Sequence, residues 1–272
     1  MLQSRLRTAT AMALVFLALP TVSALALEKV SFPSGDGTSI TGWMMKPSGQ
    51  GPFPAVVALH GCGGLWSRSG ALNPRHADWG DRLQAAGYVV LFPDSFRSRG
   101  FESVCNTLDR SITPAGRARD AFGAADWLAS QPFVAKNRIG LLGWSNGGST
   151  ALHAARNGAR PSTTDFRTVI SFYPGCTTIL KNGWSARVPV TILHGADDDW
   201  TPAAPCEMLA KAGGARFVSY PGAYHDFDHP NLPIRTRNAA YSVRGDGIVT
   251  IGTHGPSRSD AINRVMGLFG GM

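Results

Sequence analysis

The sequence predicts an α/β fold with a mostly parallel central sheet and helices on both of its faces. Three observations lead to this prediction. Short apolar runs alternate with longer segments of helical periodicity, which is the pattern of repeated β-α-β units. Several of the apolar runs are uninterrupted, as expected for strands buried on both faces. Glycines and polar residues follow directly after these runs, where the carboxyl ends of parallel strands carry ligand-binding loops.

The start of the chain predicts an export signal rather than part of the fold. Arg5 and Arg7 precede an apolar run at 11–19, and small residues at 24–26 form an A-x-A cleavage site. The run is too short to span a bilayer comfortably. We therefore expect a signal peptide over 1–26, a periplasmic or secreted protein and no stable membrane anchor after cleavage. The alternative is an uncleaved N-terminal anchor.

The rest of the chain, residues 27–272, is predicted to form a single domain. It is long enough to bury a sizeable core, and no linker, repeat or low-complexity tract divides it. The formal net charge of the full sequence is +8, but its basic residues are scattered and form no Lys/Arg run. This distribution favours a solvated basic surface over nucleic-acid binding.

The first half of the chain predicts a hairpin followed by alternating strands and helices. Strands at 28–32 and 40–46 flank a Gly-Asp-Gly turn at 35–37, which is typical of a β-hairpin. The elements expected next are a strand at 54–60, a helix at 76–87 that ends at a glycine, a strand at 88–93 and a helix at 113–131 with one apolar stripe.

The second half continues the same alternation. A small-residue run from 147 to about 158 predicts a helix directly after a short apolar strand. The other elements expected are strands at 138–142, 168–173, 188–194 and 215–220, and helices at 202–213 and 259–269.

A G-x-S-x-G motif lies at 143–147, between the strand at 138–142 and the helix that follows. A strand, a sharp turn and a helix in this order form the nucleophile elbow of serine hydrolases. The turn exposes the Ser145 hydroxyl, and the flanking glycines avoid collisions with the strand and the helix. The helix N-terminus also provides N–H groups and a positive dipole end for an oxyanion. The alternative is a glycine-rich turn with a solvated serine.

The acid candidates follow the strand at 188–194. A nucleophilic serine needs a general base and a carboxylate that orients the base, and α/β hydrolases carry them in the order Ser, Asp or Glu, His. Gly195, Asp198 and Pro202 fit the pattern G-x-x-D-x-x-x-P that such enzymes often show here. Asp198 is therefore the predicted acid and Asp197 the fallback, with Asp199 interpreted as a solvated residue or a helix cap.

The predicted base is His225, which follows the strand at 215–220. His229 is the second candidate. His225 and His229 could also bind a metal together with Asp226 and Asp228, but the flanking prolines and glycine disfavour the helix that such i,i+4 spacing requires. The sequence therefore predicts neither a metal nor a cofactor.

Two backbone N–H groups are expected to form the oxyanion hole. Asn146, directly after the nucleophile, provides one of them. The second is predicted in the HGCGG stretch at 60–64, which is a close relative of the HGGG-type motif. Its glycines let the backbone approach a substrate oxygen. Cys62 is the expected donor and Gly63 the second candidate, while Cys62 as nucleophile is an alternative that a serine elbow makes unnecessary.

Taken together, these residues resemble the dienelactone hydrolase family of α/β hydrolases. The matching stretches are HGCGG at 60–64, GYVVLFPDSFRSRG at 87–100, GWSNGG at 143–148, YPGC at 173–176, DDWTPAAPC at 198–206 and YPGAYHDFD at 220–228. The resemblance implies the α/β-hydrolase fold and a catalytic triad. One departure is that the family's enzymes proper use a cysteine nucleophile, where this chain has Ser145. Arg97 and Arg99 are candidates for the arginines that bind the substrate carboxylate in that family.

The expected function is an exported serine hydrolase that cleaves small-molecule carboxylic esters or lactones through an acyl-enzyme. Ser145 would attack the carbonyl, His225 would move the proton and Asp198 would hold the imidazole. Two alternatives are a peptidase or amidase of the same fold, and a non-catalytic binding protein that retained the fold.

The four cysteines are expected to form two disulfides in an oxidising compartment. In this fold Cys176 and Cys206 follow neighbouring strands, and Cys62 and Cys105 lie in loops after two other strands. The favoured pairs are therefore Cys62 with Cys105 and Cys176 with Cys206. The alternative is four separate, buried and reduced thiols.

Overall fold

The computed structural model describes residues 27–107, 111–159 and 163–272. The predicted signal peptide at 1–26 lies outside the described residues. No helix in the described part of the chain is long and apolar enough to cross a membrane.

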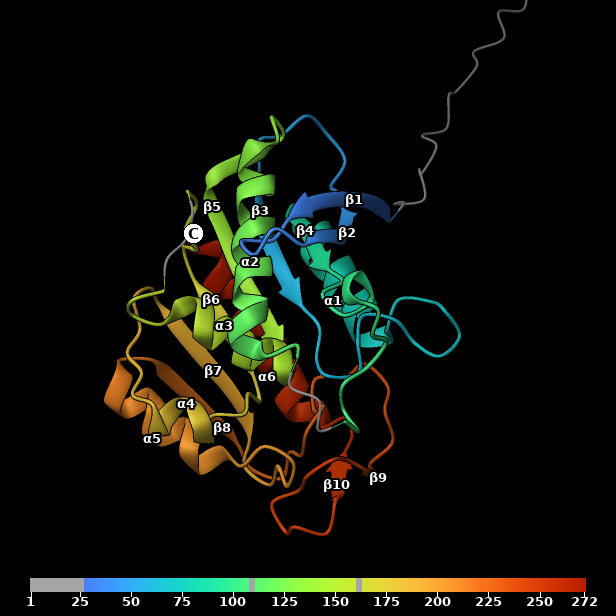
Figure 1. Ribbon diagram of the computed structural model, residues 1–272, viewed down its shortest axis with the longest axis vertical. Helices are drawn as coiled ribbons and strands as arrows, with labels where there is room; N and C mark the ends of the chain where they lie inside the picture. The colour runs from blue at the N-terminus through green and yellow to red at the C-terminus, as the bar shows by residue number, and fades with distance from the viewer. Residues whose placement is uncertain (1–26, 108–110, 160–162) are drawn as a thin grey trace, which may run out of the picture.

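The centre of the fold is an eight-stranded, mostly parallel sheet, as predicted, in the order β1-β2-β4-β3-β5-β6-β7-β8 (Figure 1). Its only antiparallel pairs within that sheet are β1 with β2 and β2 with β4. The strands are β1 (Glu28–Pro33), β2 (Ser39–Met45), β3 (Phe53–Leu59), β4 (Val89–Pro93), β5 (Val134–Trp144), β6 (Val169–Phe172), β7 (Val190–Gly195) and β8 (Arg216–Tyr220). The uninterrupted apolar runs are the central strands, and β4, β6 and β7 are buried along their whole length.

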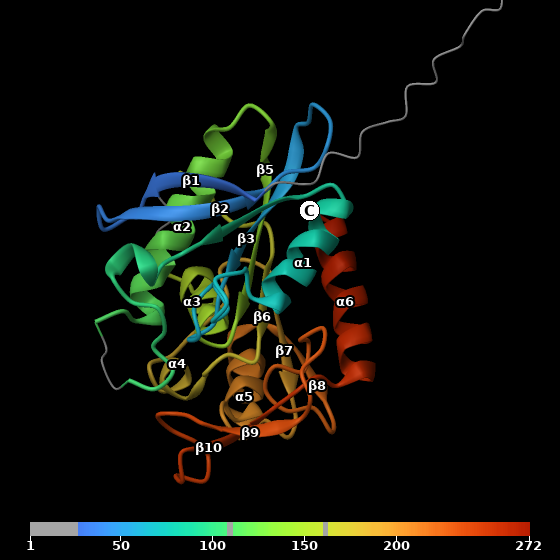
Figure 2. The same ribbon diagram turned by 90° about the vertical axis from the view of Figure 1, so that its right-hand side faces the viewer.

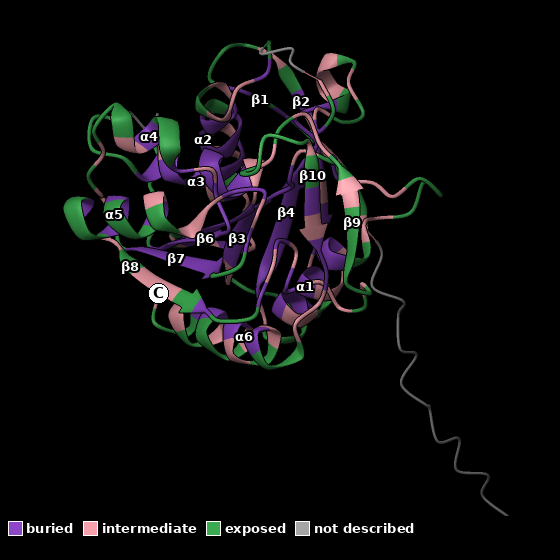
Figure 3. Ribbon diagram, turned by 90° about the horizontal axis from the view of Figure 1, so that it is seen from below, coloured by how far each residue is buried: buried purple, intermediate pink, exposed green. Residues whose placement is uncertain are grey.

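Helices cover both faces of the sheet, which confirms the predicted layers (Figure 2). One core lies between the sheet and α2, α3 and α5, and the second lies between the sheet and α1 and α6. Figure 3 shows the buried strands enclosed by helices whose outer surfaces are exposed. The helices are α1 (Pro74–Ala85), α2 (Pro114–Ser130), α3 (Asn146–Ala155), α4 (Thr177–Lys181), α5 (Ala203–Gly213), α6 (Gly255–Gly270) and the short 3-10 helix η1 (Arg97–Arg99).

The ends of several elements follow from local chemistry. Asn73 and Thr113 cap α1 and α2 with side-chain oxygens that accept backbone N–H groups, and a proline follows each cap. The closing helix α6 begins four residues before the predicted 259, because Pro256 fits its first turn. Strand β5 is longer than the predicted 138–142, since its first residues also pair with β3.

A two-stranded ribbon, β9 (Arg235–Asn238) with β10 (Ile248–Ile251), was not predicted from the sequence. It packs over the loop that carries His225: the Gly252 N–H donates to the His225 carbonyl at 3.0 Å, and Ile251 forms a parallel bridge with His225. Val249 and Ile251 bury their side chains against Trp200 and Cys105. The ribbon thus covers the loops that follow β7 and β8.

Candidate active site

Ser145 occupies a sharp turn between β5 and α3, with φ 54° and ψ −114°. Such a positive φ is uncommon for a residue with a side chain and is strained. A Cβ on Gly143 would lie 2.2 Å from the Gly147 carbonyl oxygen, and one on Gly147 would lie 2.1 Å from the Leu59 carbonyl oxygen. Both positions therefore require glycine. The motif at 143–147 has the strand-turn-helix geometry that the sequence predicts.

Asp198 is the only member of its aspartate triplet that contacts a histidine side chain among the described residues. Its Oδ2 lies 2.7 Å from His225 Nδ1, and its Oδ1 accepts the backbone N–H groups of Trp200 and Thr201, both at 2.9 Å. Asp197 is exposed. Asp199 faces Thr250 instead and accepts hydrogen bonds from the Thr250 backbone N–H and Oγ1, at 2.7 and 2.9 Å. Asp198, the predicted acid, is thus the aspartate beside the predicted base, and its role as the orienting acid stays a prediction.

His225 is buried, with Trp200 and Tyr173 rings beside it at centroid distances of 4.7 and 4.4 Å. Burial alone lowers its pKa, but the charge and hydrogen bond of Asp198 outweigh burial, and the pKa of His225 is raised above 6.5. Burial raises the pKa of Asp198, yet His225 brings the net pKa of this carboxyl below its usual value. Within the described residues, His225 Nε2 has no hydrogen-bond partner.

His229, the second candidate for the base, lies away from this pair. Its Nδ1 accepts the Asn231 N–H at 3.2 Å, and it does not line the cleft at Ser145.

Asp226 forms an ion pair with Arg75, which brings the pKa of Asp226 to about 2 against the opposing effect of burial. In the described part of the chain, no group of three or more His, Cys, Asp or Glu side chains could hold a metal ion.

Asp228 belongs to a buried polar cluster beneath the site. It accepts hydrogen bonds from the indole nitrogens of Trp79 and Trp144, each at 2.8 Å, and from the Tyr173 hydroxyl. Arg75 also donates to the Tyr173 hydroxyl, at 2.8 Å. The cluster joins α1, β5 and the loop after β8, so it fixes the loop that carries His225.

The HGCGG loop lies against the elbow, as its predicted role in an oxyanion hole requires. A Cβ on Gly61 would lie 3.4 Å from the Trp144 carbonyl oxygen and 3.5 Å from Ser145 Cβ. The Cys62 carbonyl accepts the Val104 N–H at 2.8 Å, which ties this loop to the segment around 103–105. The loop lines a cleft of about 90 Å³ together with Ser145 and His225.

The sequence as a whole matches a known family. The family model for the dienelactone hydrolase family matches residues 40–270. The chain belongs to this family. The predicted resemblance to this family is thereby confirmed.

Two further proteins are similar to the chain over part of its length. An uncharacterized peptidase of Bacillus subtilis, YuxL, is 23% identical over 253 residues, and the match covers 78% of this chain but 37% of YuxL. A polyketide transferase of Aspergillus fumigatus is 29% identical over 192 residues, covering 65% of this chain and 60% of that protein. The chain thus spans little more than a third of the length of the first relative.

Solved structures share the fold. A Klebsiella pneumoniae protein assigned as a dienelactone hydrolase superposes with a TM-score of 0.66 at 20% identity, covering 91% of this chain and 99% of that one. A dienelactone hydrolase-like promiscuous phosphotriesterase from metagenomic libraries gives a TM-score of 0.66 at 21% identity, with 90% and 97% covered. Porphyromonas gingivalis dipeptidyl peptidase 4 gives 0.62 at 16% identity, with 89% and 35% covered. These likenesses confirm the α/β-hydrolase fold.

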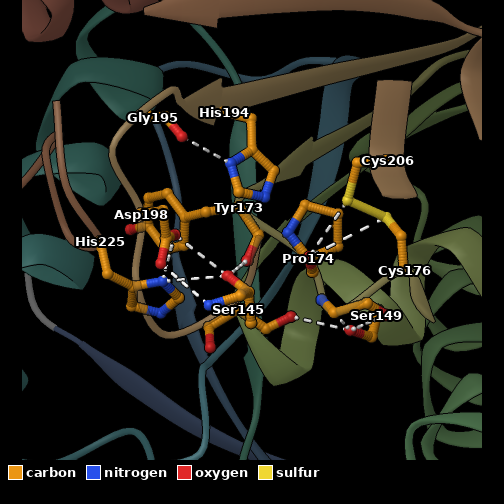
Figure 4. The surroundings of a disulfide bond; sticks show 12 residues. Ser145, Ser149, Tyr173, Pro174, Cys176, His194, Gly195, Asp198, Cys206 and His225 are labelled. Carbon is orange, nitrogen blue, oxygen red and sulfur yellow. Dashed lines mark hydrogen bonds and ion pairs between the residues drawn. A yellow bond between two sulfur atoms is a disulfide. The ribbon is translucent and has the colours of Figure 1, made fainter. Parts of the chain in front are cut away.

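Both predicted disulfides are present in this dienelactone hydrolase family member. Cys62 pairs with Cys105, and Cys176 pairs with Cys206, with Cα separations of 4.9 and 5.0 Å. The alternative of four separate thiols is therefore wrong, and so is a nucleophilic Cys62, because its sulfur is bonded to Cys105. Figure 4 shows the Cys176–Cys206 bond near Ser145, Asp198 and His225.

Replacing Cys176 and Cys206 together by serine is expected to lower the free energy of unfolding by about 2–4 kcal/mol, because the bond closes a long loop in the unfolded chain. Urea unfolding of the oxidised proteins measures this difference. The control is unfolding with a thiol reductant present throughout, under which the wild type should lose at least as much stability. An unchanged urea midpoint for the oxidised double variant would contradict the prediction.

Several cleft residues were not predicted from the sequence. Arg75, Trp200 and Arg237 line the cleft beside Ser145, and the Arg237 guanidinium lies 5.1 Å from the Trp200 ring. No motif marks Arg75 or Arg237, since α1 and the ribbon bring them to the site from distant parts of the chain. Trp200 lies in the quoted stretch at 198–206, but it was given no role there. The arginines proposed from the family resemblance are elsewhere: Arg99 is bound to Asp120 at 2.7 Å, and Arg97 stacks over Trp66.

Proposed function

We propose that this family member is a serine hydrolase that cleaves small-molecule carboxylic esters or lactones through an acyl-enzyme. The observation that carries this proposal is that Ser145, on a strained elbow, lines the same cleft as His225, whose other ring nitrogen contacts the buried Asp198. Family membership supports hydrolysis. The cleft volume of about 90 Å³ favours small acyl groups.

In the proposed first step, His225 Nε2 takes the hydroxyl proton as Ser145 Oγ attacks the carbonyl carbon. The tetrahedral intermediate collapses, His225 returns the proton to the leaving alcohol, and the acyl group stays on Ser145. Water then attacks the acyl-enzyme with the same proton transfers in reverse, releasing the carboxylic acid and free Ser145. A lactone would give a single hydroxy acid. Asp198 remains ionised throughout and holds the imidazole through Nδ1.

The proposed oxyanion donors are the N–H of Asn146 and the N–H of Cys62, with Gly63 as the second candidate. Asn146 is the first residue of α3, and the first N–H groups of a helix have no partner within it. Donors fixed in advance around the developing charge account for a large part of catalysis in such sites.

The test is a panel of p-nitrophenyl esters of increasing acyl length, lactones and p-nitroanilides, combined with labelling by a fluorophosphonate. We expect turnover of short esters or lactones and labelling at Ser145. Anilides cleaved faster than esters would instead indicate the peptidase or amidase alternative. A folded protein without labelling or turnover would indicate the binding-protein alternative.

We also propose that the protein works after export, in the periplasm or outside the cell. Two disulfides are compatible with an oxidising compartment. N-terminal sequencing of the protein from a periplasmic or culture fraction tests the proposal, with a mature start near Leu27 expected. Recovery of the intact N-terminus in the cytoplasmic fraction alone would contradict it.

The pH profile of kcat/KM should show an acid limb with a midpoint above 6.5. His225 must be neutral to accept the proton, and Asp198 raises the pKa of this histidine above 6.5, so protonation removes activity as the pH falls through the raised value. Initial rates at low substrate from pH 5 to 9 measure the midpoint. A limb centred at or below 6.5 would contradict the assignment of His225 as the base.

A further inference from the structure

Arg117 is a fully buried arginine close to the elbow. It lies near the N-terminus of α2 with an exposed fraction of 0%. Its Nη1 donates to Asn146 Oδ1 at 2.5 Å, while Nε and Nη2 have no hydrogen-bond partner within the described residues. Two nearby arginines differ: Arg119 and Arg99 both form ion pairs with Asp36. Arg117 is therefore a buried cation whose hydrogen-bond acceptor is a neutral amide.

This arrangement is unfavourable for stability alone. Burying a charge without a hydrogen-bonded carboxylate costs free energy, and a cation near a helix N-terminus opposes the helix dipole. Burial lowers the pKa of Arg117 to about 10, so the guanidinium remains charged at neutral pH. The charges of Asp120 and Asp94 and the Phe96 ring, 4.8 Å from the guanidinium carbon, provide partial compensation.

The guanidinium lies between the two loops that carry the proposed oxyanion donors. On one side it holds the side chain of Asn146, the residue after Ser145. On the other side, the Phe96 ring beneath it packs against the His60 ring at a centroid distance of 4.6 Å. His60 begins the HGCGG loop, and its Nδ1 lies 2.8 Å from the Gly61 carbonyl oxygen. Arg117 thus contacts one half of the proposed oxyanion hole directly and reaches the other through Phe96 and His60.

We propose that Arg117 is a positioning residue of the oxyanion hole. Its bond to Asn146 Oδ1 fixes residue 146 and thereby the direction of the Asn146 N–H. The inference rests on the proposed serine hydrolase function. It explains why this fold retains a buried cation beside a neutral amide, because groups fixed in advance stabilise a transition state without reorganising during the reaction.

The test compares Arg117→Met with Arg119→Met in the same helix. Arg119 is 54% exposed and pairs with Asp36 at 3.6 Å, away from the cleft. Arg117→Met should lower kcat about tenfold or more, less than the loss of a direct oxyanion donor, with KM within about twofold. Arg119→Met should retain wild-type kcat. Affinity for a trifluoromethyl ketone, which forms a charged tetrahedral adduct with the serine, should fall by a similar factor.

Asn146→Ala tests the other end of the same hydrogen bond, also in case Arg117→Met fails to fold. It keeps the backbone N–H but removes Oδ1, so kcat should again fall about tenfold with KM preserved. If Arg117 acts through Asn146, the double variant should be about as slow as the slower single variant. The inference would be overturned if the kcat losses of the two single variants multiply in the double variant. It would also be overturned if folded Asn146→Ala keeps a kcat within threefold of wild type.

Ser145→Ala separates this inference from the proposed function. If Ser145→Ala is inactive while folded Arg117→Met keeps wild-type kcat, the role of Arg117 is wrong and the serine hydrolase proposal stands. If Ser145→Ala keeps wild-type turnover, the proposed function itself is wrong and the role of Arg117 falls with it.

Discussion

Replacing Ser145 by alanine is expected to lower ester turnover by at least about three orders of magnitude. The loss is this large because the nucleophile, the base and the orienting carboxylate act as a unit, and without the hydroxyl neither His225 nor Asp198 has a proton transfer to assist. Alanine fits the same turn, so the thermal unfolding midpoint should not fall. Single-turnover and steady-state rates with a short p-nitrophenyl ester measure the effect.

Ser149→Ala is the matched control, since Ser149 is a serine one turn further along α3, where it is buried. Its Oγ accepts the Gly175 N–H at 2.8 Å and donates to the Ser145 carbonyl at 3.3 Å, but it does not line the cleft. This variant should keep fluorophosphonate labelling, whereas Ser145→Ala should lose it. Turnover by Ser145→Ala within tenfold of wild type would show that Ser145 is not the nucleophile.

The parts of the site that were predictable from sequence are encoded by short segments. The elbow needs glycine at 143 and 147 because of contacts within its own strand and helix and with the adjacent β3. Asp198 was predicted among three aspartates from the local pattern of Gly195 and Pro202, and Pro202 precedes α5 in the structure. The disulfide pairs followed from the order of strands, since β6 and β7 are neighbours in the sheet.

The remaining parts depend on contacts between distant segments. Strand β9 has no apolar alternation and is mostly exposed, and β10 is only four residues long, so the position of the ribbon over His225 depends on tertiary pairing. The ion pair between Arg75 and Asp226 joins residues from α1 and from the loop after β8. The buried Arg117 looks like one of several arginines in a surface helix. Such residues are identified only when the fold shows which loops they reach.

Asp198→Asn is expected to lower kcat/KM by about three to four orders of magnitude, because an amide cannot stabilise the imidazolium and can stabilise the wrong tautomer of His225. Asp198 is the buried carboxylate that contacts His225 Nδ1 at 2.7 Å. The acid limb of the residual activity should also shift to lower pH, since the charge that raises the pKa of His225 is removed. Rates across pH 5 to 9 measure both effects.

The two neighbouring aspartates provide matched controls that differ only in where the fold places them. Asp197 is exposed, and Asp199 bonds to Thr250 with its carboxylate 3.3 Å from the Arg244 guanidinium. Because neither carboxylate contacts His225, Asp197→Asn and Asp199→Asn should each keep kcat/KM within about threefold of wild type. Equal, mild losses at all three positions would place the orienting acid elsewhere. A large loss at Asp199 alone would instead mean that activity depends more on the position of the ribbon than on the contact between Asp198 and His225. Asp199 anchors the ribbon through Thr250.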